Sequence, residues 1–382
     1  MAQVDVAVVG LGALGSAAAY HAARKGAKVV GFEQFELGHV HGASHDTSRI
    51  VRTSYYAPEY VALARAAYKD WAEIENAVGY KLIHTTGGVV LFGRQAPAQC
   101  SDYASSLAAN KVPYEVLTPE EVSRRWPQFD TSDIVDAVYT ADSGIVHAAR
   151  CVSTMQNLAR SHGAVLMEHT PVSRIVPETS GTGVRIETSK GEFRAAKVIL
   201  ATDAWSNKLL EPLGASIPLK VSQEQVTYYK PTDTAAFDMS RFPVWIVFDA
   251  KCYYGFPTFG EPNIKCARDE AENYMMPDER TYIHSEELEQ ELSTFMQTLV
   301  PDKGRRIART VTCQYTVTPE RNLIISPLPK HRDIIVGLGA AQGFKFAPAI
   351  GRVLAELALD GKTKEDISLW SLTDGGVTPS KL

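Results

Sequence analysis

Cysteine is scarce in this sequence, and basic residues are not in excess. The 382 residues include five cysteines, an odd number with no Cys-x-x-Cys spacing. This usage argues against a disulfide framework and a zinc cage, so we expect no metal site and a reducing compartment. The chain has 39 Lys and Arg residues against 44 Asp and Glu residues, a net charge of −5, and no long basic run. A nucleic acid partner is therefore not expected.

Long apolar runs are absent as well. No run approaches the roughly 20 residues of a membrane-spanning helix, and the first residues lack the basic start and apolar stretch of a signal peptide. We expect no contact with a membrane. The composition, with 45% apolar and 22% charged residues, is that of an ordinary folded protein. Because single cores stop growing at roughly 250–300 residues, the length predicts two domains or one large α/β unit with an inserted layer.

The last three residues, Ser380-Lys381-Leu382, form the tripeptide that peroxisomal import receptors recognise. This tripeptide predicts a peroxisomal location, with an import receptor as a partner, if the source is a eukaryote. For any other source the predicted location is the cytoplasm.

The start of the chain follows the pattern of a dinucleotide-binding βαβ unit. A valine-rich run over 4–9 leads into Gly10, Gly12 and Gly15, an alanine-rich helix follows, and a second apolar run ends at Glu33. Glycines at this spacing permit a tight turn and let backbone N–H groups approach a pyrophosphate, while the acid accepts hydrogen bonds from a ribose. We expect an ADP-containing dinucleotide. The pattern does not separate FAD from NAD.

The rest of the chain alternates helical and strand patterns without a repeat or a linker. Helical spacing and caps predict helices over 58–78, from 118, and over 147–161, 285–299 and 348–359. Aromatic and β-branched residues between 223 and 270 favour a mixed sheet that belongs to a second domain. Since no linker separates the two parts, the two domains are expected to interleave along the chain.

The segment 41–52 is too polar for a core element. It is either a surface loop or the wall of a pocket in which Arg49 and Arg52 bind an anion or the edge of a flavin. In the second case, each guanidinium would offer a carboxylate two parallel donors. Periodicity alone does not decide between the two.

Several motifs together resemble the monomeric sarcosine oxidase family, which also holds N-methyltryptophan, pipecolate and fructosyl amino acid oxidases. The resemblance runs from end to end and implies a mixed α/β fold. A glutathione-reductase-like FAD-binding domain would comprise 1–84, 146–219 and 317–382, and an interleaved substrate domain on a mixed β-sheet would comprise 85–145 and 220–316. The motifs are the opening glycines, Ser44–Arg52, Tyr253–Pro257, Lys265, Cys313–Glu320 and Gly343–Phe346.

The resemblance implies FAD as the cofactor, attached covalently through an 8α-S-cysteinyl bond to Cys313. The alternative is a purely structural role for Cys313 as a small buried apolar residue, which is the role of most free cysteines. The implied cofactor-binding residues are Gly10, Gly12, Ala13, Leu14, Gly15, Glu33, Gln34, Ser44, Arg49, Cys313, Gly343, Phe344 and Lys345.

The implied activity is that of a flavin-dependent oxidase. It would oxidise the C–N bond of a secondary amino acid, N-methylated or cyclic, to an imine and reduce O2 to H2O2. Arg52 and Lys345 would hold the substrate carboxylate, and Lys265 would assist O2 as a fixed cation. The remaining implied catalytic residues are Tyr254 and the flavin-contacting pair His45 and Arg49, whose positive charge would stabilise the reduced flavin. The other implied substrate-binding residues are Tyr55, Trp245, Ala341 and Asp269.

Departures from the family pattern leave the substrate open. Asp269 replaces a usual histidine, and either pairs with a cation or a phenol of a larger substrate or forms a salt bridge with Arg268 or Lys265. Trp245 replaces a smaller residue, Asp203 stands where glycine is common, and 340–342 departs from Ser-Gly-His. One alternative is an N-methyl aromatic amino acid oxidase with oxidative cyclisation in fungal secondary metabolism. Others are a nicotinamide-dependent dehydrogenase and a non-catalytic flavin carrier. We expect a monomer.

Overall fold

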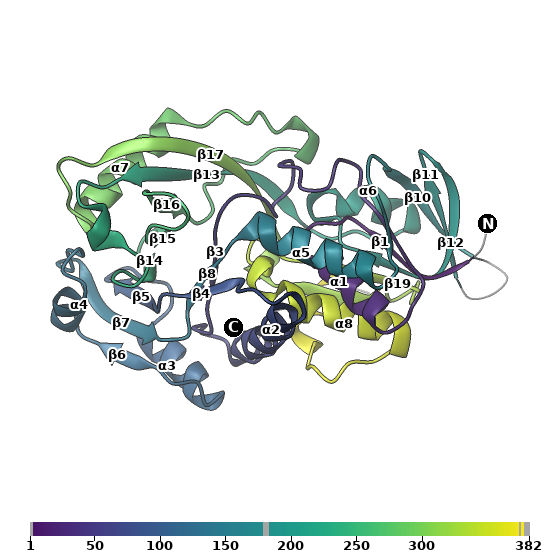
Figure 1. The fold of residues 1–382 in the computed structure, drawn as a ribbon, viewed down its shortest axis with the longest axis horizontal. Coiled ribbons are helices and arrows are strands. Elements are labelled where there is room, and N and C mark those ends of the chain that lie inside the picture. The colour runs from purple at the N-terminus through teal and green to yellow at the C-terminus, as the bar shows by residue number, and fades with distance from the viewer. Residues whose placement is uncertain (1–2, 179–182, 374–375, 378–382) are drawn as a thin grey trace.

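Two large sheets dominate the computed structural model, which describes residues 3–178, 183–373 and 376–377. Figure 1 shows the first sheet on the right, with the N-terminus, and the second on the left. Within the described residues, no helix has both the length and the apolar character to cross a bilayer. All five cysteines are free. The tripeptide Ser380-Lys381-Leu382 lies outside the described residues.

The first sheet has eight strands and contains the predicted βαβ unit. Val4–Val9 (β1) pairs in parallel with Val29–Phe32 (β2) on one side and with Gly191–Leu200 (β12) on the other. Strands covered on both faces are expected to be apolar throughout, and the last four residues of β1 are buried. The order is β10-β11-β12-β1-β2-β9, with β19 beside β12 and β18 beside β19. The other strands are Val165–Met167 (β9), Val172–Pro177 (β10), Val184–Thr188 (β11), Ile324–Pro327 (β18) and Ile334–Leu338 (β19).

Two of the helices in this half pack very closely against each other. A Cβ built on Gly351 would lie 2.4 Å from Cβ of Ala17, so small residues are required where the first and last long helices cross. The helix over Ala13–Arg24 (α1) stops just before Gly26, which has a positive φ of 88° that favours glycine. The other helices of this half are Pro58–Val78 (α2), Ala148–Ser161 (α5), Ser206–Leu210 (α6) and Ala347–Asp360 (α8).

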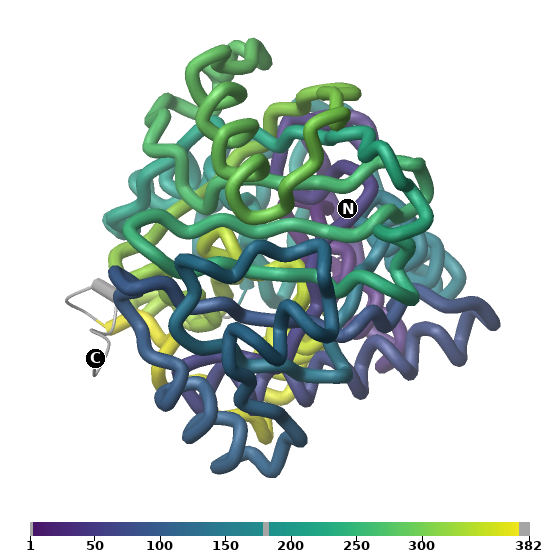
Figure 2. Tube along the Cα trace, turned by 90° about the vertical axis from the view of Figure 1, so that its left-hand side faces the viewer, coloured from purple at the N-terminus to yellow at the C-terminus, as the bar shows by residue number. Residues whose placement is uncertain are grey.

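The second sheet also has eight strands, in the order β17-β13-β16-β15-β14-β5-β7-β6. Figure 2 shows blue and green chain segments side by side in this half, where Gly88–Gly93 (β5) pairs in parallel with Val244–Phe248 (β14). Its other strands are Glu115–Leu117 (β6), Ile134–Thr140 (β7), Lys220–Lys230 (β13), Cys252–Phe256 (β15), Ile264–Arg268 (β16) and Arg306–Val317 (β17). Its helices are Cys100–Ala109 (α3), Pro119–Arg125 (α4) and Glu286–Leu299 (α7).

The caps that the sequence indicates are present on two of these helices. Thr118 accepts from the Glu121 backbone and Glu121 returns a carboxylate to the Thr118 backbone, which completes a capping box on α4. Ser285 caps α7 through the Leu288 N–H. Local chemistry therefore sets where these helices begin.

A third, three-stranded sheet connects the two halves. Arg49–Val51 (β3) and Ile83–Thr85 (β4) pair with opposite edges of Gly144–Val146 (β8). The segment 41–52 is thus not only a surface loop, because its last part is a strand with a buried Ile50. A short hairpin of Leu372–Thr373 (β20) and Gly376–Val377 (β21) ends the described chain.

The mixed α/β fold class is confirmed. All strands of the first sheet come from 1–84, 146–219 and 317–382, and those of the second come from 85–145 and 220–317. The domain boundaries themselves remain a prediction.

Candidate active site

A cavity of about 690 Å³ is lined by residues from all three sheets. It contacts every site residue that the sequence predicts except Gly15 and Trp245. These side chains are far apart in the chain, and the crossing of the chain between the sheets brings them together.

The glycine-rich turn between β1 and α1 forms one end of the cavity. Gly10 has a φ of 86°, and a Cβ on Gly15 would lie 1.8 Å from the Gly10 carbonyl oxygen. Gly15 therefore packs the helix against the turn and does not line the cavity. Glu33 accepts from the Leu11 N–H at 2.9 Å, and Ser44 Oγ accepts from the Ala13 N–H at 3.0 Å.

This end fits the nucleotide part of FAD. A buried carboxylate stands at the end of β2, and burial alone would raise its pKa, but hydrogen bonds from His39 and Leu11 hold the pKa of Glu33 below its usual value. An ionised Glu33 accepts hydrogen bonds from ribose hydroxyls. Gly12 is the N-cap residue of α1 and provides no side-chain cap, which leaves N–H donors of the first helical turn for a pyrophosphate.

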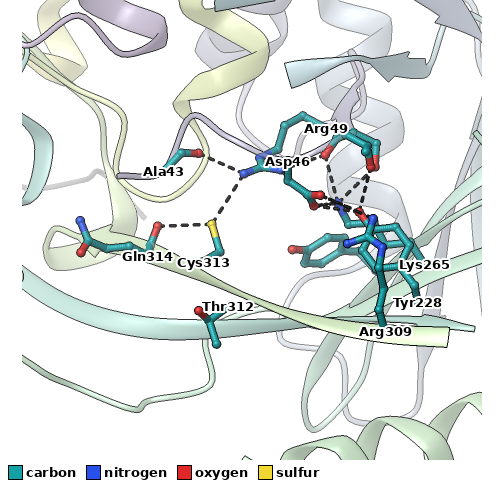
Figure 3. Close-up of polar contacts among 12 residues, drawn as sticks. Ala43, Asp46, Arg49, Tyr228, Lys265, Arg309, Thr312, Cys313 and Gln314 are labelled. Atoms are coloured by element: carbon teal, nitrogen blue, oxygen red, sulfur yellow. Dashed lines mark hydrogen bonds and ion pairs between the residues drawn. The ribbon is translucent and has the colours of Figure 1, made fainter. Parts of the chain in front are cut away.

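Cys313 and Arg49 both line the cavity and contact each other (Figure 3). Arg49 donates to Cys313 Sγ at 3.6 Å and to the carbonyl oxygens of Ser48 and Ala43 at 2.9 and 3.0 Å. Cys313 lies on β17, whose pairing with β13 places it opposite Glu224. Backbone acceptors thus fix the guanidinium with one of its donors directed at the sulfur.

Lys265 occupies a buried corner of the same cavity and is 3% exposed. Its Nζ donates to Asp46 Oδ2 at 2.8 Å and to Ser48 at 3.1 Å, as Figure 3 shows for the Asp46 contact. Burial lowers the pKa of Lys265 to about 8, with Asp46 opposing the shift and Arg49 adding to it. A lysine with this pKa exchanges its proton close to neutral pH.

Asp46 has several partners besides Lys265. The Tyr228 hydroxyl donates to its two oxygens at 2.9 and 2.8 Å, and Arg49 and Arg309 approach them to 3.9 and 4.0 Å. Burial alone would raise the pKa of Asp46, but Lys265 and Arg49 hold it well below its usual range. The carboxylate is therefore charged and anchors Lys265.

His45 differs from the expectation of a charged residue beside the flavin. Burial, followed by the charges of Arg49 and Arg280, lowers its pKa to about 3. Its Nε2 atom has no hydrogen-bond partner among the described residues. At neutral pH, Arg49 and not His45 carries the positive charge here, and His45 Nε2 remains available to a bound group.

The other end of the cavity contains Arg52 and Lys345. The Arg52 guanidinium carbon lies 4.1 Å from the centre of the Tyr55 ring, and Lys345 Nζ lies 5.8 Å from the same centre. Arg52 also donates to the Ser54 carbonyl, and the Trp71 indole donates to the Lys345 carbonyl at 3.0 Å. Two basic side chains beside one aromatic ring form a place for a carboxylate.

Asp269 lines this end but pairs with a residue that the sequence did not suggest. Arg321 donates to its two oxygens at 2.7 and 3.0 Å, in the parallel geometry that guanidinium favours. The expected salt bridge with Arg268 or Lys265 is corrected: Arg268 pairs with Glu272 and Glu291, and Lys265 pairs with Asp46. The charge of Asp269 is thus balanced within the protein.

The structure also corrects the prediction that Trp245 binds the substrate. Its side chain is 1% exposed and packs in the core on the other face of the second sheet, over Gly255, where a Cβ would lie 2.1 Å from the indole. Successive side chains of a strand point to opposite faces. The next residue, Ile246, therefore lines the cavity, and Trp245 does not.

The remaining predicted residues lie on the cavity wall. The Tyr254 hydroxyl is 3.2 Å from that of Tyr315, and Ala341 has a positive φ of 64°. Asp203 also lines the cavity, and burial raises its pKa to about 6. Sequence reasoning did not select Asp46, Tyr228, Tyr315 or Arg321 as site residues, although three of the four lie within or beside the quoted motifs.

Known proteins are similar to this chain over nearly its whole length. The profile of the FAD dependent oxidoreductase (DAO) family matches residues 5–357. A monomeric sarcosine oxidase from Bacillus sp. (strain B-0618) is 31% identical, over 96% of this chain and 95% of its own length. A peroxisomal sarcosine oxidase from Homo sapiens is 28% identical, over 93% and 92%. The open form of NikD, an unusual amino acid oxidase essential for nikkomycin biosynthesis, superposes with a TM-score of 0.83 at 27% identity, over 96% and 97%.

Proposed function

The chain belongs to the family of FAD dependent oxidoreductases, and we propose that it is an amino acid oxidase of the sarcosine oxidase type. Its substrate is a secondary amino acid, N-methylated or cyclic, and its products are an imine and H2O2. One observation carries this proposal: Arg52 and Lys345 flank the Tyr55 ring in the cavity that also holds Cys313, Arg49 and the glycine turn. Bound FAD supplies a two-electron acceptor that O2 reoxidises.

Arg52 and Lys345 bind and orient the substrate carboxylate. With the carboxylate fixed, the C–H bond next to the nitrogen is held in one position, which contributes to the rate through orientation. That bond breaks with loss of hydride, and the nitrogen lone pair forms the C=N bond. Water hydrolyses the imine, or a nucleophile of the same molecule traps it.

Cys313 is the proposed attachment point, through a bond between Sγ and the 8α carbon of the cofactor. The Arg49 donor at 3.6 Å supports this role, because it holds the sulfur at a defined place in the cavity lining. Cys252 also lines the cavity, but it lies on β15, near Asp269 and away from Arg49. Of the two cavity thiols, Cys313 is the one with a guanidinium contact.

Lys265 is proposed to assist the reduction of O2. Asp46 and Ser48 hold its ammonium group in place. A fixed cation lowers the cost of placing negative charge on O2, because no solvent needs to reorient.

An N-methylated aromatic amino acid is the second candidate substrate. The rings of Tyr56, Tyr103 and Phe248 line the cavity and offer apolar faces to an aromatic side chain. The fungal cyclisation remains an alternative outcome for its imine. A nicotinamide-dependent dehydrogenase is not favoured, because the family match is to FAD-dependent proteins.

The state and location of the protein belong to the same proposal. A monomer is supported by the relatives that are monomeric sarcosine oxidases. A peroxisomal location in a eukaryotic source rests on Ser380-Lys381-Leu382 and on the peroxisomal human relative. Otherwise the proposed location is the cytoplasm.

Anaerobic reduction of the purified holoprotein tests the proposal. Sarcosine, pipecolate, proline, N-methyltyrosine and fructosyl amino acids are added separately, and the visible flavin absorption is followed. At least one of these compounds should bleach the flavin, and air should restore the colour with formation of H2O2. A colourless protein, or a yellow one that none of them bleaches, would contradict the proposal.

A further inference from the structure

Lys345 is a buried basic side chain that forms no ion pair with a carboxylate among the described residues. It lies on the short 3-10 helix Gly343–Phe346, and its Nζ donates to the Gln342 carbonyl at 2.8 Å. None of the ion pairs among the described residues includes Lys345. The amine therefore has one backbone acceptor, lies near the rings of Tyr55 and Phe346, and belongs to a side chain that lines the cavity.

The charges that face Lys345 are mostly positive. Arg49 and Arg52 approach from β3 and its end, and Arg321 approaches from the turn after β17. Asp269, the carboxylate with the largest effect on it, has both oxygens bonded to Arg321. Tyr55, which both Arg52 and Lys345 flank, is uncharged because burial raises its pKa.

Burial, and then the charge of Arg52, lowers the pKa of Lys345 well below its usual value, with Asp269 opposing. An ammonium group with a desolvated, cationic environment and no counter-ion loses its proton. The same environment attracts the carboxylate of a ligand.

The proposed substrate, in contrast, carries a proton on its nitrogen that it has to lose before oxidation. A secondary amino acid in water is a zwitterion whose ammonium group has a pKa of about 10. Hydride can leave the neighbouring carbon only when the nitrogen has a free lone pair. The ammonium proton must therefore move to another atom after the substrate binds and before oxidation.

We propose that Lys345 is neutral in the free protein and accepts the ammonium proton of the substrate when the substrate carboxylate binds. The inference rests on the proposed function and deepens it, since the same residue becomes both carboxylate ligand and proton acceptor. An N–H bond of the substrate breaks, an N–H bond forms at Lys345 Nζ, and no electrons are transferred. The resulting ammonium faces the bound carboxylate, so the negative charge that the site lacked stabilises the proton.

A carboxylate without an ammonium group isolates this step. (Methylthio)acetate replaces the amine of N-methylglycine by sulfur, and tetrahydrofuran-2-carboxylate replaces that of proline by oxygen. Neither is a proton donor at neutral pH, so Lys345 must take its proton from solution when they bind. Calorimetric titration of the holoprotein in buffers of different ionisation enthalpy measures this uptake, which should be about one proton per ligand.

Lys345→Arg is the matched variant, because a guanidinium keeps the charge and remains protonated. It should bind the same ligands without proton uptake. Lys345→Met, whose side chain has no titratable group, should bind them more weakly and also without uptake. Both variants leave the Gln342 backbone and the Asp269–Arg321 pair in place.

The pH dependence of kcat/KM gives a second readout. In Lys345→Arg the neutral amine has to come from solution, so kcat/KM should fall about tenfold for each pH unit below the pKa of the substrate. The wild-type protein should show a much flatter profile. A purely structural effect of the substitution would lower kcat/KM equally at every pH.

Binding without proton uptake by the wild-type protein would overturn the inference, and so would uptake that persists in Lys345→Arg. Failure of both carboxylates to bind, or of every amino acid to bleach the flavin, would instead contradict the proposed function. Bleaching together with ligand binding and no proton uptake would leave the proposed function intact and exclude only the role of Lys345.

Discussion

Lys265 Nζ lies 2.8 Å from Asp46 Oδ2, and this contact joins a strand of the second sheet to the segment that follows the dinucleotide unit. The carboxylate serves three cations, since Arg49 and Arg309 approach its oxygens to 3.9 and 4.0 Å. Lys265 is therefore held in one position at the cavity. Its charge depends on Asp46, which raises its pKa, and on Arg49, which lowers it.

Lys265→Met should slow the reoxidation of the reduced flavin by about a hundredfold or more, because a preorganised cation is lost where negative charge develops. Anaerobic reduction by the substrate should change little. Stopped-flow absorbance separates the two half-reactions. An equal loss in both would contradict the assigned role.

Asp46→Asn should move the alkaline limb of kcat/KM for O2 to lower pH. Asp46 raises the pKa of Lys265 against the effect of burial, so its removal lowers that pKa below about 8 and the ammonium is lost earlier as pH rises. Steady-state oxygen kinetics across pH measure the shift.

Glu261→Gln is the control for this shift. Glu261 pairs with Arg309 at 2.6 Å but does not contact Lys265, so its removal should leave the limb in place. An unchanged limb in Asp46→Asn would show that the carboxylate does not tune the lysine.

Cys313→Ala should release the flavin on precipitation with strong acid, whereas the wild-type protein should keep it in the pellet. Cys252→Ala removes a second thiol from the same cavity and should keep the flavin attached. Flavin absorbance of the supernatant and pellet is the measurement. Acid-stable flavin in Cys313→Ala would place the attachment elsewhere.

Arg321→Met should destabilise the fold by about 3 kcal/mol, because it leaves the carboxylate of Asp269 without its partner. The double variant Asp269→Asn with Arg321→Met should recover much of this loss. Urea unfolding measures both.

The exposed pair of Arg124 and Glu121 provides the comparison, and Arg124→Ala should cost about 0.5 kcal/mol or less. If Arg321→Met also lowered the free energy of unfolding by only about 0.5 kcal/mol, the charge of Asp269 would not need its ion-pair partner for stability.

Glu224→Gln should stabilise the protein above pH 7 and have little effect below pH 4.5. Glu224 is 3% exposed, and burial raises its pKa from 4.5 to about 7, so its contribution to stability is complete below 4.5 and is lost as pH rises to about 7. The gain at high pH should be about 3 kcal/mol. Denaturant unfolding at several pH values measures it, and a pH-independent difference would contradict the assignment.

Elements with local signals were predictable from the sequence. The glycine turn, the Thr118 capping box and the Ser285 cap each depend on residues within a few positions of one another. The short strand β3 was not, because Arg49 and Ile50 find their partners almost a hundred positions later, at Val146 and Ile145. Nothing local indicates such a pairing.

The same distinction holds for the site. Family resemblance predicted residues that the structure brings to one cavity, and their roles stay predictions. It did not give Asp46 or Arg321 as the partners of Lys265 and Asp269, since each pair is formed by the fold. The prediction for Trp245 was wrong for a different reason. Successive side chains of a strand point to opposite faces of the sheet, so Trp245 points away from the cavity that the next residue, Ile246, lines.

The interleaving of the two sheets has a consequence for biosynthesis. The cavity wall begins at Val9 and is completed only by Lys345, so a nascent polypeptide lacks one side of it until Lys345 has left the ribosome. We therefore expect products of translation that stop before Lys345 to emerge colourless.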